Sequence, residues 1–259
     1  MTITTIVTQL EPGGTPAQLD GRLASALAIA QAFRSHLIAL VFSADGEAED
    51  KGEAAAHALD AAQRHGVTTE VRARSSFAYG VGEVFADQLR VSDLAVLSLH
   101  PGGGPATRFM LSAAVFDSGR PVLLVPEGRP MAGLPRRILV GWDASPAAVR
   151  AVVGAMPLIE KAEEVIVVTV SDDKTLRTGQ SGIELTRLLA RHGAKASFTT
   201  IRRDGRNPLA ALEEHATQQE AEMLVLGAVR HAPLHELIFG SATAALFASA
   251  ARRPALVAS

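Results

Sequence analysis

An acidic residue and several small residues follow apolar runs in the second half of the chain, at strand ends where open α/β sheets bind their ligands. Asp143 comes directly after the apolar run 137–142, and Gly227 comes directly after the run 223–226. Glycine lets the backbone approach an anion closely, and a helix N-terminus attracts phosphate through its free N–H groups and positive end. A small-residue segment that opens a helix therefore predicts a phosphate site: Gly240, Ser241 and Thr243.

The same residues also have a purely structural interpretation, which the sequence leaves open. Glycine at a strand end and Gly-Ser before a helix are ordinary turn and cap chemistry. Asp143 and Ser145 have the composition of a cap for a helix that starts at Pro146. His231 and His235-Glu236 share one loop, but without a third nearby ligand they indicate a solvated loop rather than a metal site.

Alternating strands and helices must position these residues. In the second half we expect strands at 137–142, 164–170, 196–201, 223–226 and 255–258, and helices at 146–159, 183–192, 208–219 and 241–251. The first half repeats this order, with strands at 3–8, 37–42, 68–73, 94–97 and 121–125. Apolar strands separated by helices indicate βαβ units. The predicted fold class is α/β, with two tandem open parallel five-stranded sheets and helices on both faces.

Length and composition agree with two domains and exclude several classes of protein. We expect domains at 1–126 and 137–259, joined by a Gly- and Pro-containing linker at 127–136. The net charge of −2 provides no positive electrostatic field that would attract nucleic acid. The absence of cysteine excludes disulfides and thiolate chemistry. No apolar run approaches the ~18 residues of a membrane span, and the N-terminus lacks signal-peptide features. We therefore expect a cytoplasmic protein with no nucleic-acid or membrane partner.

The second half carries a recognisable pattern. The segment 138–145 reads I-L-V-x-x-D-x-S, and after the fourth strand come Gly227 and, later, Gly240-Ser241. This pattern resembles the universal stress protein family, and the resemblance covers the whole chain as two consecutive domains, like the tandem members of that family. It implies a fold like that of the adenine nucleotide alpha hydrolases. It also implies a stress-response protein that binds ATP or AMP, with or without Mg²⁺, as a regulatory ligand in the C-terminal domain. The residues that the resemblance assigns to this site are Gly141, Trp142, Asp143, Val170, Leu226, Gly227, Gly240, Ser241, Ala242 and Thr243. Arg230, which lies within the motif, is a further candidate for this site.

The chain departs from the family pattern at several positions. Arg230 stands where the motif has its second glycine, so this residue is either strained in a left-handed turn or supplies charge to a phosphate. In the first half, Leu10 aligns with Asp143, and Ser98, Pro101 and Leu111 replace the loop glycines. The first domain is therefore expected to be degenerate, to bind no nucleotide and to act as the fixed partner of the second.

Three functions follow as alternatives. The first is a non-catalytic module whose nucleotide occupancy is a signal, with Trp142 either packing beside the first strand or stacking near the adenine. The second is a dimerising scaffold without nucleotide, in which 121–125 and 255–258 pair within one chain or in a homo-oligomer. The third is a weak ATPase. No Ser-His-Asp order, P-loop or dinucleotide motif is present, so we expect no enzyme.

Arg252-Arg253 is expected to face solvent at a helix end.

Overall fold

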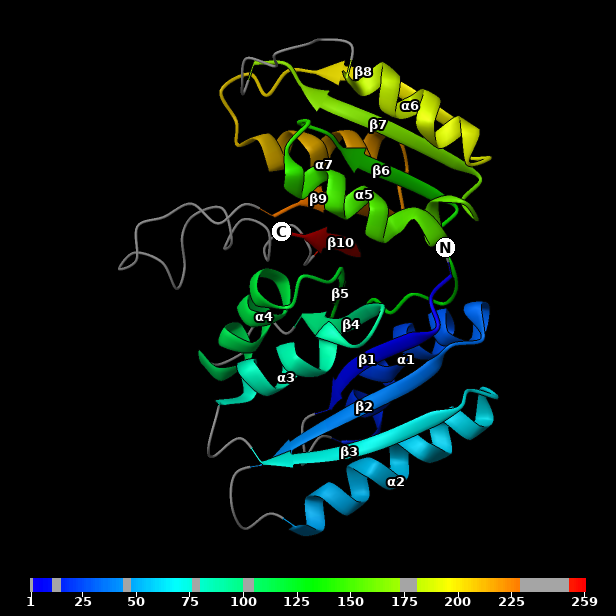
Figure 1. Ribbon diagram of the computed structural model, residues 1–259, viewed down its shortest axis with the longest axis vertical. Coiled ribbons are helices and arrows are strands. Elements are labelled where there is room, and N and C mark those ends of the chain that lie inside the picture. Colours follow the sequence, from blue (N-terminus) through cyan, green and yellow to red (C-terminus); the bar gives the residue numbers. More distant parts are fainter. Residues whose placement is uncertain are drawn as a thin grey trace. The chain divides into compact units, whose positions relative to one another are not determined.

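The chain divides into two compact units, Met1–Gly133 and Leu134–Ser259. The boundary falls inside the segment 127–136 that the sequence predicts as a linker. The computed structural model describes residues 2–10, 15–43, 48–75, 80–99, 105–172, 181–228 and 252–259. Each unit is an α/β layer structure with five parallel strands (Figure 1).

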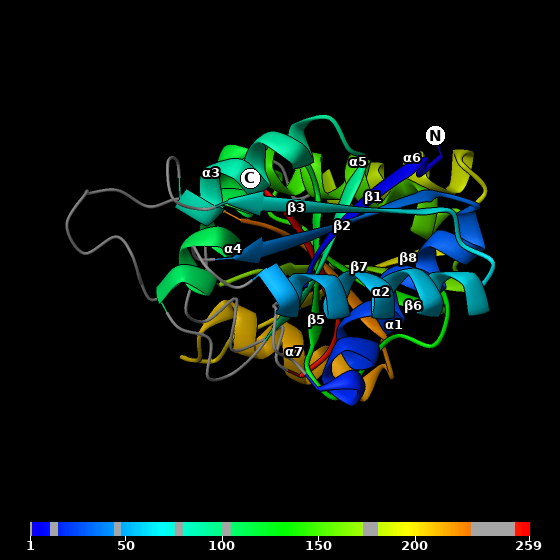
Figure 2. The same cartoon turned by 90° about the horizontal axis from the view of Figure 1, so that it is seen from below.

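The first unit holds a parallel sheet in the order β3-β2-β1-β4-β5. Helices α1 and α2 pack together against β1, β2 and β3, while α3 packs against α4 (Figures 1 and 2). The elements follow the chain as β1 (Thr5–Leu10), α1 (Pro16–Phe33), β2 (His36–Ser43), α2 (Ala48–Arg64), β3 (Thr69–Ser75), α3 (Gly80–Arg90), β4 (Leu94–Leu99), α4 (Pro105–Asp117) and β5 (Val122–Pro126).

The second unit repeats this topology in the order β10-β9-β6-β7-β8. The chain runs outward from β6 through β7 to β8 and then returns to β9 on the other side of β6, so the strand order reverses between β6 and β9. The elements are β6 (Arg137–Gly141), α5 (Pro146–Ile159), β7 (Glu164–Val170), α6 (Ser181–Arg191), β8 (Ala196–Ile201), α7 (Pro208–Gln218), β9 (Met223–Gly227) and β10 (Ala255–Ala258).

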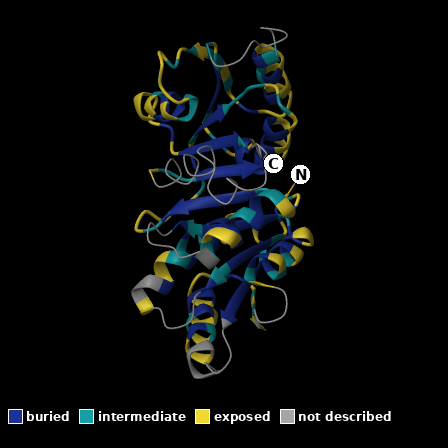
Figure 3. Ribbon diagram, turned by 90° about the vertical axis from the view of Figure 1, so that its left-hand side faces the viewer, coloured by how far each residue is buried: buried dark blue, intermediate teal, exposed yellow. Residues whose placement is uncertain are grey.

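The buried strands are made of Val, Leu, Ile and Ala, as expected for parallel strands covered on both faces. Ile138, Leu139 and Val140 in β6 are fully buried, and so are Met223 and Leu224 in β9. Most of the strand ribbon is dark blue, the colour of buried residues, in Figure 3. β8 is only partly buried because it is the last strand in the order of its sheet. The apolar runs thus form the cores, and the carboxyl ends of the strands are left to meet solvent or ligand.

Helix starts follow the predicted cap chemistry. Ser145 precedes Pro146, and its hydroxyl accepts from Ala148 N at 3.1 Å. Asn207 precedes Pro208, and its side chain accepts from Leu209 N at 2.9 Å. A side-chain cap satisfies one of the N–H groups that the first helical turn leaves unpaired. The predicted bounds of β7, β8 and β10 match the observed strands, and the predicted helix 241–251 lies outside the described residues.

The expectation that Arg253 faces solvent is wrong. Its side chain is 14% exposed and pairs with Glu213 on α7, which is 4% exposed, at 2.9 Å. Arg253 also donates to Ala221 O at 2.5 Å and to Thr217 Oγ1 at 2.6 Å. A guanidinium is buried only where partners satisfy its donors, and α7 supplies them here.

In the first unit, the carboxylate of Asp93 accepts hydrogen bonds from the residues at the start of β1. Asp93 Oδ2 accepts from Thr4 N at 2.8 Å, from Thr4 Oγ1 at 2.6 Å and from Thr5 N at 3.0 Å. Burial acts to raise the pKa of Asp93, but these hydrogen bonds and the charge of Arg120 together outweigh it and lower the pKa below its ordinary value. The folded state therefore favours the ionised carboxylate.

Acid is expected to remove this stabilisation. Because the folded pKa of Asp93 lies below the unfolded one, its contribution is complete above pH ~4 and is lost as the pH falls through the folded pKa. Asp93→Asn should lower the free energy of unfolding by about 1 kcal/mol at pH 7, a value reduced because the group is partly exposed. Denaturant unfolding at pH 7 and pH 3 checks this, since the difference between wild type and variant should shrink at pH 3. An equal difference at both pH values contradicts it.

Candidate functional site

The candidate site lies at the carboxyl edge of the second sheet, where the strand order reverses between β6 and β9. In open α/β sheets ligands bind at this kind of switch point. Gly141 on β6 is in register with Leu226 on β9 and with Val168 on β7. The structure thus brings one group of sequence-predicted residues to neighbouring strand ends: Gly141, Trp142, Asp143, Val170, Leu226 and Gly227.

Both glycines at these strand ends have close neighbours, but only those of Gly227 are backbone atoms. A Cβ on Gly227 would lie 2.4 Å from Ala148 N and 2.7 Å from Ala147 C, so the end of β9 touches the first turn of α5. A Cβ on Gly141 would lie 2.8 Å from Leu226 Cδ2 and 3.1 Å from Leu212 Cδ1. The small size of these residues is therefore explained by their own neighbours. Their contact with a ligand stays a prediction.

Asp143 lies in a tight turn that follows the carboxyl end of β6, where the strand order reverses. Its Oδ1 accepts from Ser145 N at 3.0 Å, and Ala144 between them has a left-handed φ of 57°. A left-handed alanine is strained, and the Asp143–Ser145 hydrogen bond helps to hold it. The cap interpretation of this segment is thus confirmed, and the same turn fixes the half-buried carboxylate in one orientation.

Trp142 is anchored on the side of the site next to β7 and α6. Its indole Nε1 donates to Ser181 Oγ at 3.2 Å, and Ser181 is the first residue of α6. Its backbone N donates to Val168 O and its backbone O accepts from Thr169 Oγ1, both at 2.8 Å. These contacts give Trp142 a packing role between strand ends and helix, while its half-buried ring lies close to Asp143 in the chain. It is the only tryptophan of the protein.

A charged turn beyond β7 and β8 borders the site, and sequence reasoning missed it. Asp172 Oδ1 accepts from Arg203 N at 2.8 Å and Oδ2 from Asp204 N at 3.3 Å. The Arg203 hydrogen bond lowers the pKa of Asp172 below its ordinary value, and the charge of Arg202 adds to this. The signal was the R-R-D-G-R segment at 202–206, where Asp204 and Gly205 both have positive φ.

The remaining predicted site residues lie outside the described residues. These are Arg230, Gly240, Ser241, Ala242 and Thr243, and the loop residues His231, His235 and Glu236 lie outside them as well. Within the described ranges, no cluster of three or more His, Asp or Glu side chains is placed to hold a metal ion. None of the described helices combines the length and apolar character needed to cross a bilayer.

The backbone hydrogen bonds correct the alignment of the two halves. His36 N donates to Thr4 O as Glu164 N donates to Arg136 O, and Asp93 N donates to Thr5 O as Glu222 N donates to Arg137 O. Thr4 and Thr5 are therefore equivalent to Arg136 and Arg137.

The alignment of Leu10 with Asp143 is wrong by one residue as a consequence. Leu10 is equivalent to Trp142, and the position equivalent to Asp143 is Glu11, which lies outside the described residues. Gln9 and Ser98 stand at the positions of Gly141 and Gly227. The first unit thus lacks both strand-end glycines, and its inability to bind nucleotide stays a prediction.

Comparisons with known structures show the same fold. A universal stress protein from Archaeoglobus fulgidus matches with a TM-score of 0.70 and 16% identity over 97% of this chain and 95% of its own. A putative universal stress protein from Pseudomonas aeruginosa gives 0.65 and 18% over 99% and 93%. The cytoplasmic domain of a prokaryotic cation chloride cotransporter gives 0.55 and 16% over 98% and 94%, so one fold serves different contexts.

The sequence itself carries the family assignment. No curated protein matches the chain. The model of the universal stress protein family matches residues 135–257, which is nearly the whole second unit. The second unit therefore carries a domain of the universal stress protein family.

Proposed function

We propose that the second unit binds an adenine nucleotide, ATP or AMP, at the carboxyl edge of β6, β7 and β9 and uses its occupancy as a signal. The observation that carries this proposal is the placement of Asp143 two residues after the end of β6, at the strand-order reversal, on a turn that fixes its carboxylate. Family membership of residues 135–257 supports it.

Each described residue would have a distinct part in this binding. The Asp143 carboxylate accepts hydrogen bonds, so it would take donors from the exocyclic amine of the base or from the ribose hydroxyls. Val170 and the Trp142 ring would supply apolar surface for the base. Arg230 and the small residues 240–243 would face the phosphates, with Mg²⁺ accompanying ATP.

The proposed role is not enzymatic. No motif in the sequence places a base or nucleophile beside the site, so weak ATP hydrolysis would be incidental. We also propose that the protein acts in the cytoplasm. Binding would change the surface around the site, and a partner would respond to that change.

A scaffold without nucleotide remains the second candidate. β5 closes the strand order of the first unit and β10 that of the second, and both are apolar. Apolar edge strands need cover, which pairing within the chain or in a homo-oligomer would supply. This candidate predicts no response to nucleotide.

Calorimetric titration of ATP, with and without Mg²⁺, tests the proposal. We expect saturable binding at one nucleotide per chain and at least about tenfold weaker binding by Asp143→Ala, because a hydrogen bond to a charged group is lost. Asp143→Asn keeps an acceptor for Ser145 N and separates loss of charge from loss of the turn. Quenching of Trp142 fluorescence gives an independent readout.

The possible results separate the candidates. No heat and no quenching with the wild type would favour the scaffold. Two nucleotides per chain would overturn the degenerate status of the first unit. Equal affinity of wild type and Asp143→Ala would remove Asp143 from the site.

A further inference from the structure

The outer edge of β3 is the open side of the first unit's sheet. β3 ends the strand order, and among the described residues β2 is the strand that pairs with it. Leu37 N donates to Thr68 O at 2.9 Å, so the backbone groups of even-numbered residues along β3 face β2. The N–H and C=O groups of Thr69, Val71 and Ala73 therefore point outward. Ala73 O accepts from the guanidinium of Arg74 at 3.3 Å, a contact that a backbone donor would replace.

Charges of both signs lie along one face of this strand. Glu70, Arg72 and Arg74 share a face because successive side chains of a strand point to opposite sides. Arg72 identifies this face as the α3 side, since its Nη1 donates to Gln88 Oε1 at 2.7 Å. Arg72 also binds both oxygens of Glu70, at 2.7 and 2.8 Å. This hydrogen bonding lowers the pKa of Glu70, so Glu70 is charged at neutral pH.

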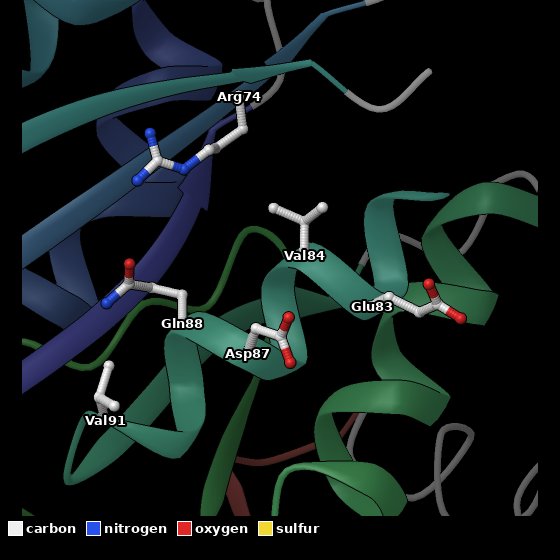
Figure 4. Close-up of a pocket in the computed structure, with 6 residues that line it drawn as sticks. All are labelled: Arg74, Glu83, Val84, Asp87, Gln88 and Val91. Carbon is white, nitrogen blue, oxygen red and sulfur yellow. The ribbon is translucent and has the colours of Figure 1, made fainter. Parts of the chain in front are cut away.

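The space beside this face is open to a further strand. Figure 4 shows Arg74 projecting from β3 toward the side of α3 that carries Val84 and Gln88. A groove of about 390 Å³ lies between them, lined by Arg74, Glu83, Val84, Asp87, Gln88 and Val91. Val91 is 74% exposed. Side chains from an added strand therefore have room on this face.

We propose that two copies of the chain associate by antiparallel pairing of their β3 strands, centred on Arg72. In that register Glu70 of each copy lies opposite Arg74 of the other, and Val71 lies opposite Ala73. Opposite charges directly across an antiparallel pair stabilise it. Charges on an edge strand usually prevent pairing, but in this register Glu70 and Arg74 of each copy both meet an opposite charge.

The backbone supports the same register. Val71 and Ala73 have outward N–H and C=O groups, so they form hydrogen-bonded pairs with one another in the two copies. The register pairs all seven residues of β3. Arg72 of one copy lies opposite Arg72 of the other in a non-hydrogen-bonded pair. The repulsion between the two guanidinium groups is reduced because each Arg72 forms an ion pair with Glu70 of its own copy. A two-fold axis through Arg72 makes the contact self-complementary and closed.

A pair of charge variants tests the proposal. The interface is small, so sedimentation velocity should show a monomer–dimer equilibrium with a dissociation constant of roughly 100 µM. Arg74→Glu alone and Glu70→Arg alone should each weaken the dimer at least about tenfold, because like charges then face each other. An equimolar mixture of the two variants should recover dimers within about threefold of the wild-type affinity, since both pairs between positions 70 and 74 are again opposite in charge. Ser197→Glu on β8 is the matched control and should leave the dimer unchanged.

Cross-linking checks the register. The chain contains no cysteine, so an introduced one reports alone. Arg72→Cys should form a disulfide-linked dimer under mild oxidation, because non-hydrogen-bonded pairs bring side chains close. Ala73→Cys should not, because position 73 faces position 71. A wild type that stays monomeric up to about 1 mM, a mixture that fails to recover dimers, or preferential cross-linking of Ala73→Cys would each overturn the proposal.

Discussion

Gly227→Ala is expected to lower the free energy of unfolding by about 3 kcal/mol or more, the largest effect of any single methyl group considered for this protein. The new Cβ would lie 2.4 Å from Ala148 N and 2.9 Å from Ala148 Cα. These are backbone atoms of the first turn of α5, so no side chain can rotate away. Relief requires a shift of the whole helix or of the end of β9.

A second glycine provides the matched control in the same unit. The Cβ of Gly141→Ala would lie 2.8 Å from Leu226 Cδ2 and 3.1 Å from Leu212 Cδ1, which are the ends of flexible side chains. We expect a loss of about 1 kcal/mol there. Denaturant unfolding of both variants compares the two. Equal losses, or an unchanged stability of Gly227→Ala, would contradict the close approach of β9 to α5.

The sequence predicted the elements well because local signals decide them. Ser145-Pro146 and Asn207-Pro208 predict helix starts from local sequence alone, and the structure has both caps. The apolar runs of β7, β8 and β10 end where polar or turn residues begin, so their bounds could be predicted to the residue. The placement of the end of β6, just before Asp143, beside the end of β9 followed from the general topology of parallel sheets.

Long-range packing decided what the sequence could not predict. Gly227 looks like a residue kept small for a ligand, and only the position of α5 shows that a helix backbone occupies that space. Leu10 was misaligned because β1 mixes polar with apolar residues and extends one residue further than β6, which stops at Gly141, so apolar character alone could not set the register. Neither feature is encoded in a short segment.

Arg253 was misplaced for the same reason. Two consecutive arginines before a strand are typical of a solvated helix end, and nothing nearby in the sequence indicates a partner. Glu213 lies 40 residues away on α7 and reaches Arg253 only in the folded unit. The resulting ion pair is almost entirely removed from water.

Removing one member of this ion pair gives the second large effect expected. Glu213→Ala leaves a guanidinium that is 14% exposed without its carboxylate, and breaking a buried pair this way typically costs several kcal/mol. Arg253 keeps its hydrogen bonds to Ala221 O and Thr217 Oγ1, so we expect the low end, about 3 kcal/mol. Arg202→Ala, which breaks an exposed pair with Asp204, should cost under about 0.5 kcal/mol.

The double variant separates the charge from the packing. Replacing both partners with apolar residues, as in Glu213→Leu with Arg253→Met, removes the unpaired charge and should restore stability to within about 1 kcal/mol of the wild type. A double-mutant cycle of denaturant unfolding measures the coupling between the two sites. If Glu213→Ala costs no more than Arg202→Ala, then Arg253 reaches water in solution. In that case the Arg253–Glu213 ion pair does not hold the start of β10 against α7.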